Sequence, residues 1–364
     1  MKKLYFKVGL LLLLVGVVNV FLSRSIYKKI TPFFWGNQAI TDKRNYIVKN
    51  KDDYNLMFFG SSKTFHQIDP VLFDSIVSQD MEVHSFNYGI QNLLPPESFY
   101  LYENLLKEDS LHFKYVLMEL NWFPNIKYKN LHTRRNFYWL NNDNYVYTIN
   151  SAINSRIPLP YKVWTVGTRS VNYIDKTFNI GIVNEIFNYH AQENDETALT
   201  LDVLKDNKGF LPVNRDSAAK GENSYFLSER YLKEIEEVKR ASSVSFAKYE
   251  DVETFDYYNE VYLEKMNHLI KLSEDRGIHL IFTMPPQWKS YQYDELIPLF
   301  EQIPENHKIQ FADSRKYPEL FKKENLFDAD HVNEQGSRIL TKLIAEKFRI
   351  IVKNYPHSQK LTQN

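Results

Sequence analysis

YNEVYLEKMNHLIKLSEDRG (258–277), followed directly by IHLIFTMPP (278–286), is the stretch of sequence that decides the fold class. The first part has apolar residues at helical spacing and ends at Gly277, whereas the second is a short apolar run that ends at two prolines. A helix that leads into a fully apolar strand is the unit from which parallel sheets covered by helices are built. This stretch therefore predicts an α/β fold.

The same alternation occurs on both sides of a long middle region. Four further strands are expected at 54–60, 81–89, 114–122 and 307–313. Helices are expected at 70–78, 95–109, 293–303 and 334–354. We predict a three-layer parallel sheet, and sheets of this kind bind ligands at the carboxyl ends of their strands.

The middle region, 126–255, interrupts this pattern. Its first part is rich in aromatic residues, and its second part, 191–224, is polar and typical of a long loop. We interpret the region as a mainly helical or irregular insertion between the third and fourth strands. An apolar N-terminal helix is expected at 1–25 and a juxtamembrane tether at 26–52. The two parts of the α/β domain are expected at 53–125 and 256–354, on either side of the insertion, and a polar tail at 355–364.

The N-terminal segment has the length of a membrane-spanning helix. Residues 4–22 are almost entirely apolar and would span about 28 Å as a helix, close to the hydrocarbon thickness of a bilayer. A cleaved signal peptide is the alternative, but Phe21-Leu22-Ser23-Arg24 lacks a small-x-small cleavage pattern. We expect an uncleaved, single-pass signal anchor with a cytoplasmic N-terminus and an extracytoplasmic catalytic domain. The basic residues on the two sides of the segment are nearly balanced, so this orientation rests on the short basic N-terminus.

Composition excludes several classes of function. The chain of 364 residues has 45 basic and 45 acidic residues, and this balance gives no indication of a nucleic-acid partner. It contains no cysteine, which excludes disulfides, thiol catalysis and cysteine-ligated zinc.

Two clusters of polar residues at predicted strand or helix ends carry the candidate chemistry. Gly60-Ser61-Ser62 follows the first strand, where a serine faces the binding crevice of the sheet. Asp328 precedes His331 by three residues, just before the last helix, so its carboxylate is able to set the tautomer of the imidazole. The structural alternative is that both clusters are only turns and helix caps.

Two further residues are candidate oxyanion donors. Gly89 ends the second strand and Asn121 ends the third, so a backbone N–H and a side-chain amide lie at neighbouring strand ends. The alternative is that both are ordinary loop residues, because glycine and asparagine are common in turns.

Together these clusters resemble the SGNH/GDSL hydrolases. The family-like blocks are Gly60-Ser61-Ser62, Gly89, Asn121 and Asp328-x-x-His331, completed by an HxNxxG pattern with Asn333 and Gly336. The chain departs from the family in having Ser61 in place of the usual Asp, and Glu-Leu-Asn-Trp in place of Gly-x-Asn-Asp. The Gly-Ser-Ser form followed by Ile68-Asp69-Pro70 is similar to the membrane-anchored envelope branch, which includes proteins of teichoic-acid D-alanylation and exopolysaccharide O-acetylation.

This resemblance implies a flavodoxin-like SGNH fold and a serine esterase or O-acyltransferase. It implies that Ser62 is the nucleophile, His331 the general base and Asp328 its partner, with an oxyanion hole from Ser62, Gly89 and Asn121. No metal and no cofactor are needed for this chemistry. The expected partners are the membrane, a cell-envelope glycan or acylated small molecule, and, as a candidate, a membrane-bound O-acyltransferase; no nucleic acid is expected.

The alternative function is a catalytically inactive scaffold that keeps this fold and binds a glycan or a membrane acyltransferase. The aromatic residues of the insertion motivate a glycan as the substrate, because flat rings stack on sugars. Trp139 and Trp164 are the candidate substrate-binding residues in the set Phe137, Tyr138, Trp139, Tyr145, Tyr147, Tyr161 and Trp164. The competing interpretation is that these rings form the insertion's own small core.

Overall fold

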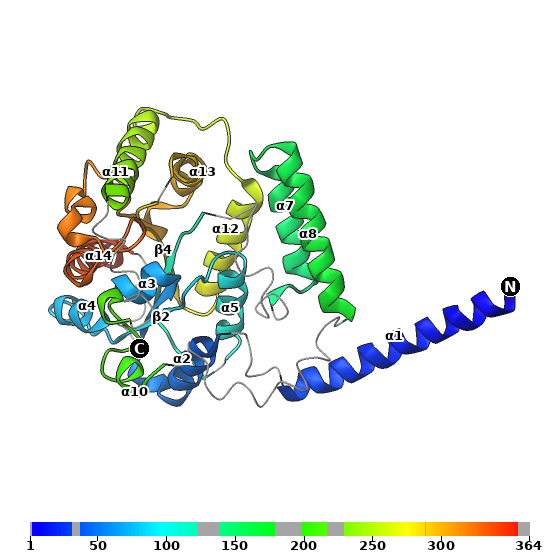
Figure 1. Cartoon of the computed structure of the whole chain (residues 1–364). Coiled ribbons are helices and arrows are strands. Elements are labelled where there is room, and N and C mark those ends of the chain that lie inside the picture. The colour runs from blue at the N-terminus through cyan, green and yellow to red at the C-terminus, as the bar shows by residue number, and fades with distance from the viewer. Residues whose placement is uncertain are drawn as a thin grey trace. The chain divides into compact units, whose positions relative to one another are not determined.

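The computed structural model in Figure 1 describes residues 2–30, 37–108, 110–122, 139–178, 199–216, 229–287 and 289–355. The chain separates into two compact units. The first unit combines residues 1–44 with 124–199, and the second combines 45–123 with 200–364.

The second unit contains a sheet of five strands, all parallel, in the order β2-β1-β3-β4-β5. Its strands are β1 Leu56–Gly60, β2 Ser85–Gly89, β3 Tyr115–Glu119, β4 His279–Met284 and β5 Lys308–Gln310. Each lies within a segment predicted to be a strand, so the α/β prediction is confirmed. The strand order changes direction between β1 and β3, and the crevice outside such a point is where open α/β sheets bind ligands.

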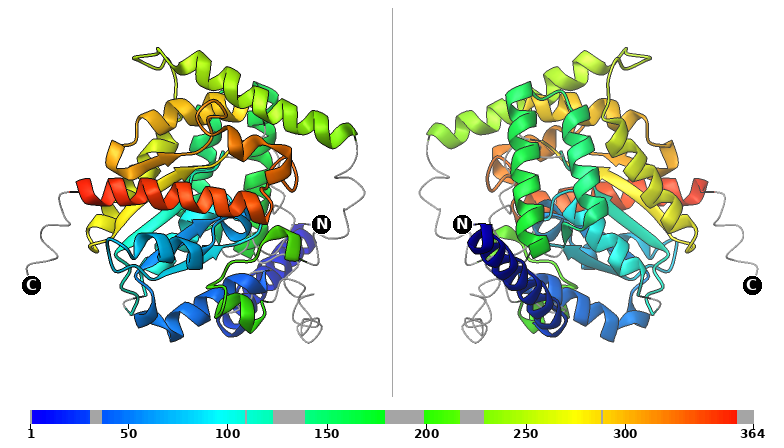
Figure 2. Two further views of the ribbon diagram at one scale, coloured as in Figure 1. Left: turned by 90° about the vertical axis from the view of Figure 1, so that its left-hand side faces the viewer. Right: turned by 90° about the vertical axis from the view of Figure 1, so that its right-hand side faces the viewer.

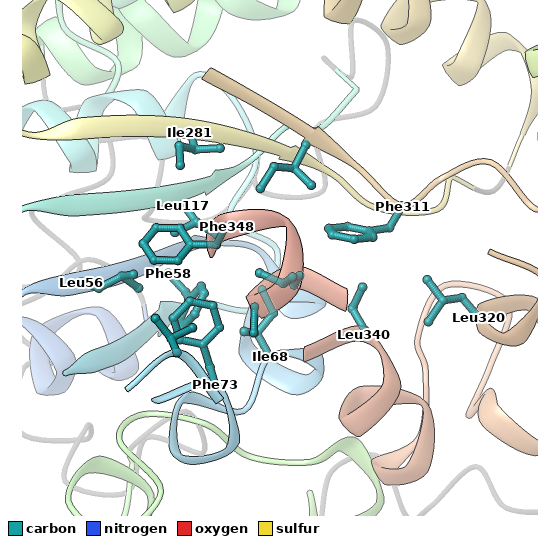
Figure 3. Packing of buried hydrophobic residues seen from close by; sticks show 14 of the residues in the cluster. Leu56, Phe58, Ile68, Phe73, Leu117, Ile281, Phe311, Leu320, Leu340 and Phe348 are labelled. Carbon is teal, nitrogen blue, oxygen red and sulfur yellow. The ribbon is translucent and has the colours of Figure 1, made fainter. Parts of the chain in front are cut away.

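One face of this sheet is covered by α4 (Pro70–Val77) and α14 (Glu334–Asn354), which pack against each other. Phe58 of β1 meets Phe73 of α4 edge-on, with ring centroids 4.9 Å apart, and Phe73 contacts Phe348 of α14. Figure 3 shows this core, in which the three rings lie beside Leu117 and Ile281 of the central strands. Aromatic and branched side chains fill the layer because alternate strand residues point to the same face.

The other face of the sheet is covered by α5 (Glu97–Leu106) and α12 (Glu260–Glu274), so the unit has three layers. Phe59 of β1 packs on Tyr102 of α5, at 5.8 Å between ring centroids. The hydroxyl groups of Tyr102 and of Ser273, on α12, lie 2.7 Å apart, which ties the two helices together. Figure 2 shows α14 crossing the sheet in the left-hand view.

Two parts of the second unit differ from the predicted boundaries. Residues 200–216 were expected to be loop within the insertion, but they belong to the second unit and include the short helix α10 (Leu201–Leu204). Helix α11 (Glu229–Tyr249) also lies in this unit and packs against α13 (Ser290–Glu301). These parts of the sequence between β3 and β4 therefore group with the α/β unit.

The first unit contains α1 (Lys2–Ile30), α7 (Asn142–Asn154) and α8 (Leu159–Phe178). Within α1, Lys2–Phe21 is long and apolar enough to cross a membrane, and it is not buried against the protein. The same test is passed by a signal sequence, so this observation supports either an anchor or a leader. Helix α7 packs against α8.

The segment expected to be a tether is partly helical. Helix α1 extends to Ile30, and a second helix, α2, covers Gln38–Lys49. Ile40 and Ile47 of α2 are buried, which stabilises this helix despite the polar composition that suggested a tether.

Candidate active site

Ser62 begins helix α3 (Ser62–Gln67), directly after β1 and the linking residue Ser61. Ser61 caps this helix, because its hydroxyl accepts a hydrogen bond from the Lys63 N–H at 3.2 Å. Ser62 is half-buried and lies at the carboxyl edge of the sheet. As the first residue of α3, Ser62 also has a backbone N–H with no acceptor inside the helix.

Ser61 is held by Glu119, the last residue of β3. The Glu119 carboxylate accepts hydrogen bonds from both the N–H and the hydroxyl of Ser61, each at 2.7 Å, and from the Thr64 hydroxyl at 2.8 Å. Glu119 is buried, so these three donors offset the cost of removing its charge from water. A side chain at Gly60 would place a Cβ 2.4 Å from the Glu119 carboxylate, which explains the glycine before the two serines.

His331 lies between Ser62 and Asp328. Its Nε2 is 2.9 Å from the Ser62 hydroxyl oxygen, and its Nδ1 is 3.0 and 2.9 Å from the two Asp328 carboxylate oxygens. A carboxylate only accepts hydrogen bonds, so Nδ1 carries the proton and the lone pair of Nε2 faces the serine. The structure thus brings together the three residues that the sequence indicated.

The Asp328–His331 loop is fixed by its own hydrogen bonds. One carboxylate oxygen of Asp328 accepts the backbone N–H of Asp330 and that of His331, both at 2.7 Å. Asn333 then caps α14 by accepting the Gly336 N–H at 3.0 Å. A Cβ at Gly336 would lie 2.2 Å from the Asn325 carbonyl oxygen, so the family-like glycine permits a close approach of two chain segments.

The two charged partners shift each other's pKa. Burial alone would raise the pKa of Asp328, but the hydrogen bond and the charge of His331 outweigh it and hold this pKa below its usual value. Burial alone would lower the pKa of His331, but the hydrogen bond to Asp328, with the charges of Asp328 and Asp330, raises it above its usual value. The pair therefore favours an imidazolium beside a carboxylate, which is the charge state formed when a serine loses its proton to histidine.

The two residues predicted to complete an oxyanion hole, Gly89 and Asn121, differ in the hydrogen bonds that they make. The Gly89 N–H donates to the Asn87 side-chain oxygen at 2.8 Å, and a Cβ at Gly89 would lie 2.2 Å from the Phe65 backbone nitrogen. The prediction for Gly89 is therefore corrected: this glycine allows β2 to approach α3, and its N–H is already used.

Asn121 lies at the strand end next to that of Ser62, and its role as an oxyanion donor stays a prediction. The β1–β3 register pairs Phe59 with Met118, so Ser62 and Asn121 each lie three residues beyond a paired position on neighbouring strands. The Asn121 carbonyl accepts the Tyr262 hydroxyl at 2.7 Å, which fixes its backbone. Among the residues that the structure describes, no hydrogen bond engages the Asn121 side-chain amide.

Two side chains beside the candidate triad, Lys63 and His66, were not among the site residues predicted from the sequence. Lys63 donates to the Pro286 carbonyl at 2.6 Å, and its ammonium lies 3.4 Å from the Asp330 carboxylate. His66 lies one helical turn after Ser62, with its ring centroid 6.2 Å from that of His331. The i, i+4 spacing of Ser62 and His66 on one helix is the signal by which the sequence could have indicated this second histidine.

His66 links the triad region to the segment 199–216. Its Nδ1 donates to the Leu211 carbonyl at 2.7 Å, and its Nε2 lies 3.7 Å from the Asp216 carboxylate. Gln91 reaches the same carboxylate, with its amide nitrogen 3.0 Å from the Asp216 oxygen. A segment predicted to be loop therefore forms part of the wall beside the candidate active site.

An aromatic pair lies at the same edge of the sheet. Trp122 follows Asn121 directly and meets Tyr291 of α13 edge-on, at 5.3 Å between ring centroids. The Trp122 indole N–H donates to Glu295 at 2.7 Å, and Tyr291 is 55% exposed. The pair offers a fixed and accessible apolar surface.

The aromatic residues of the insertion are divided between interior and surface. Trp139 is fully buried and lies 5.9 Å from the Arg169 guanidinium, so its prediction as a substrate-binding residue is corrected. Trp164 and Tyr161 are exposed, and the role of Trp164 stays a prediction. Tyr145 stacks on Tyr173 within the first unit, whereas Phe137 and Tyr138 lie outside the described residues.

No group of three or more histidine or acidic side chains that could hold a metal ion occurs in the described ranges. In comparisons with known proteins, no family model, no curated protein and no solved structure matches this chain.

Proposed function

We propose that this chain is a serine hydrolase or acyltransferase of the SGNH type that cleaves carboxylic esters. The observation that carries the proposal is the alignment of Ser62, His331 and Asp328, with His331 Nε2 at 2.9 Å from the serine hydroxyl and Nδ1 on the carboxylate. The order of the sequence blocks along the chain and the 2-1-3-4-5 strand order support the SGNH type.

The first half of the reaction follows from this geometry. Ser62 Oγ attacks the ester carbonyl carbon while its proton passes to His331 Nε2, and Asp328 stabilises the resulting imidazolium. The developing oxyanion accepts hydrogen bonds from the Ser62 N–H and the Asn121 amide. The carbon–oxygen bond of the alcohol then breaks, and the alcohol leaves with the proton from His331, which gives an acyl-serine.

The second half decides between hydrolase and transferase. Water or an acceptor hydroxyl loses its proton to His331 and attacks the carbonyl carbon of the acyl-serine. The bond between this carbon and Ser62 Oγ then breaks, and Oγ takes the proton from His331, which frees the acid or the new ester. The active site chemistry is the same for both acceptors, so the distinction depends on which acceptor binds beside Ser62.

A fluorophosphonate probe on the full-length protein tests the proposal. The wild type should be labelled, Ser62→Ala should not, and Ser61→Ala should keep its labelling because its hydroxyl serves Glu119 and not His331. Both variants should remain folded by circular dichroism. Absence of labelling in folded wild type would favour the inactive scaffold, and labelling that depends on Ser61 would overturn the choice of nucleophile.

We propose further that the ester is carried by a cell-envelope glycan, in line with the resemblance to the envelope branch. The Trp122–Tyr291 pair supports this substrate class, because a rigid aromatic surface beside the nucleophile's strand edge suits a sugar ring. Tyr291, in the second unit, is 55% exposed, and Trp164, in the first unit, is 66% exposed. Tyr291→Ala and Trp164→Ala therefore each remove one exposed aromatic ring and form a matched pair of variants.

The two variants should be compared on a small aryl ester and on an acylated oligosaccharide. A glycan-binding ring predicts a rise in KM of about tenfold on the oligosaccharide only, the size of effect that one stacking contact produces. Equal losses on both substrates, or none, would remove the support for a glycan.

A further inference from the structure

Helix α8 has its polar side buried and its apolar side exposed. Thr165 and Arg169 are buried at 3% and 1% exposure, and burial lowers the pKa of Lys176 to about 8. The exposed apolar residues of this helix, between 48% and 72% accessible, are Leu159, Tyr161, Val163, Trp164, Val171 and Ile174. At 100° per residue, Val163, Gly167, Val171 and Ile174 fall on one stripe, with Trp164 at its border.

Polar residues of α8 make contacts with α7 within the first unit. Tyr145 of α7 places its hydroxyl 2.8 Å from the Ser170 hydroxyl, and Tyr145 stacks on Tyr173 at 4.4 Å between centroids. Lys162 donates to the Ile153 carbonyl at 2.6 Å. These contacts hold α8 against α7, and among the described residues Val163, Val171 and Ile174 remain exposed.

The position of helix α1 in the same unit points to the lipid bilayer as the phase that covers this stripe. It belongs to the same compact unit as α8, the two helices contact each other, and α1 contains the segment long and apolar enough to cross a membrane. An apolar stripe in water costs about 25 cal/mol for each Å² exposed, and the bilayer is the apolar phase that a membrane-spanning α1 brings next to it. Helices with one apolar face and a polar opposite face lie in the interfacial layer of bilayers.

We propose that the exposed apolar face of α8 lies in the interfacial layer of the membrane in which α1 is anchored. The proposal rests on α1 being an anchor and is independent of the esterase chemistry. The apolar face consists of Leu159, Val163, Gly167, Val171 and Ile174. It would attach the first unit to the bilayer along α8 as well as through α1, so that the unit could not turn freely about a single helix.

The absence of cysteine allows a direct test in the full-length chain. Val163→Cys and Val171→Cys place an environment-sensitive fluorophore on the apolar face. Val244→Cys, on α11 of the second unit, is the matched control, because it is an exposed valine of similar accessibility (58%, against 64% and 56%). Leu12→Cys on α1 reports whether the anchor itself is in lipid.

Each labelled protein is reconstituted at one copy per nanodisc, with and without lipids that carry a doxyl quencher near the headgroup. We expect the doxyl lipids to quench the fluorophores at 163 and 171 at least twofold and to leave the one at 244 unchanged. Quenching of the fluorophore at 12 without quenching of those at 163 and 171 would overturn the inference, although it would still show that α1 lies in lipid. Protection of 163 and 171 from aqueous iodide only when a second protein or a second copy is present would overturn it in favour of a protein partner.

Discussion

At the scale of single residues, Ser61 and Ser62 are neighbours with the same side chain and different surroundings. The Ser61 hydroxyl donates to Glu119, so it is held inside the protein, whereas the Ser62 hydroxyl lies 2.9 Å from His331. The difference arises because Ser61 caps α3 in an extended conformation and Ser62 is the first helical residue.

Replacing Asp328 by asparagine should change both the rate and the pH dependence of ester cleavage. The proposed mechanism needs neutral His331, so activity should rise as the pH increases through the pKa of His331, which Asp328 holds above its usual value. In Asp328→Asn this pKa should fall, and the acid limb of kcat/KM should move to lower pH. The rate at neutral pH should fall by about 10²- to 10⁴-fold, because the imidazole loses its tautomer and the imidazolium its partner.

Steady-state pH profiles of wild type and Asp328→Asn measure this shift. Asp330→Asn is the control, since Asp330 also raises the pKa of His331 by its charge but makes no side-chain hydrogen bond to it. It should move the limb slightly in the same direction and keep most of the rate. An acid limb at the same pH in wild type and Asp328→Asn would contradict the assigned role of Asp328.

At the scale of elements, the segment 199–216 is attached to β2 and α3 by backbone hydrogen bonds. The Asn87 N–H donates to the Lys208 carbonyl at 2.8 Å, and the Leu211 N–H donates to the Phe65 carbonyl at 3.3 Å. Gly209 has φ +84°, and a Cβ there would lie 2.3 Å from the Asn87 carbonyl oxygen. The segment thus keeps Leu211 and Asp216 beside His66 only if residue 209 has no side chain.

Gly209→Ala should destabilise this attachment more than Gly277→Ala destabilises its own turn. Both glycines have positive φ, at +84° and +72°, so alanine costs about 1–2 kcal/mol of backbone strain at either position. Gly277 has open space around it, whereas Gly209 adds a steric clash with backbone. Denaturant unfolding should show the larger loss for Gly209→Ala, with faster amide hydrogen exchange at Asn87; equal losses would contradict the packing of this segment on β2.

At the scale of the whole molecule, the chain joins a three-layer α/β unit to a helical unit that contains the membrane-length helix. Chain segments from both sides of the insertion build the α/β unit, because β3 and β4 are neighbours in the sheet although the first unit's residues 124–199 lie between them in sequence. Ser62 and His331 come from opposite ends of this chain and meet at the carboxyl edge of the sheet.

We predict that α1 remains attached to the mature protein. Its apolar segment is long enough to cross the bilayer, which is what an uncleaved anchor requires. N-terminal sequencing of protein extracted from membranes should give the sequence that begins at Met1-Lys2-Lys3. A mature terminus between residues 23 and 30 would show instead that the segment is a cleaved leader.

The sequence by itself determined the α/β class and the five strands, and its resemblance to the SGNH/GDSL hydrolases indicated the three residues of the candidate triad. The strands follow from local patterns, because apolar runs closed by Gly60 or by prolines define them, and Asp328 and His331 are only three positions apart. Helix α14 runs over the same residues as predicted, because Asn333 caps it and a regular apolar stripe defines it. Such features depend on neighbours within a few residues.

Only the tertiary structure decided which partner each polar group takes and which rings are buried. Gly89 lost its predicted role because Asn87 accepts its N–H, and His66 gained a place beside the triad because Leu211 and Asp216, more than a hundred residues away, pack against α3. Trp139 is buried, whereas Trp164, in the same aromatic stretch, is exposed. The physical reason is that hydrogen-bond partners and burial are set by packing between distant segments, which no local pattern of residue types specifies.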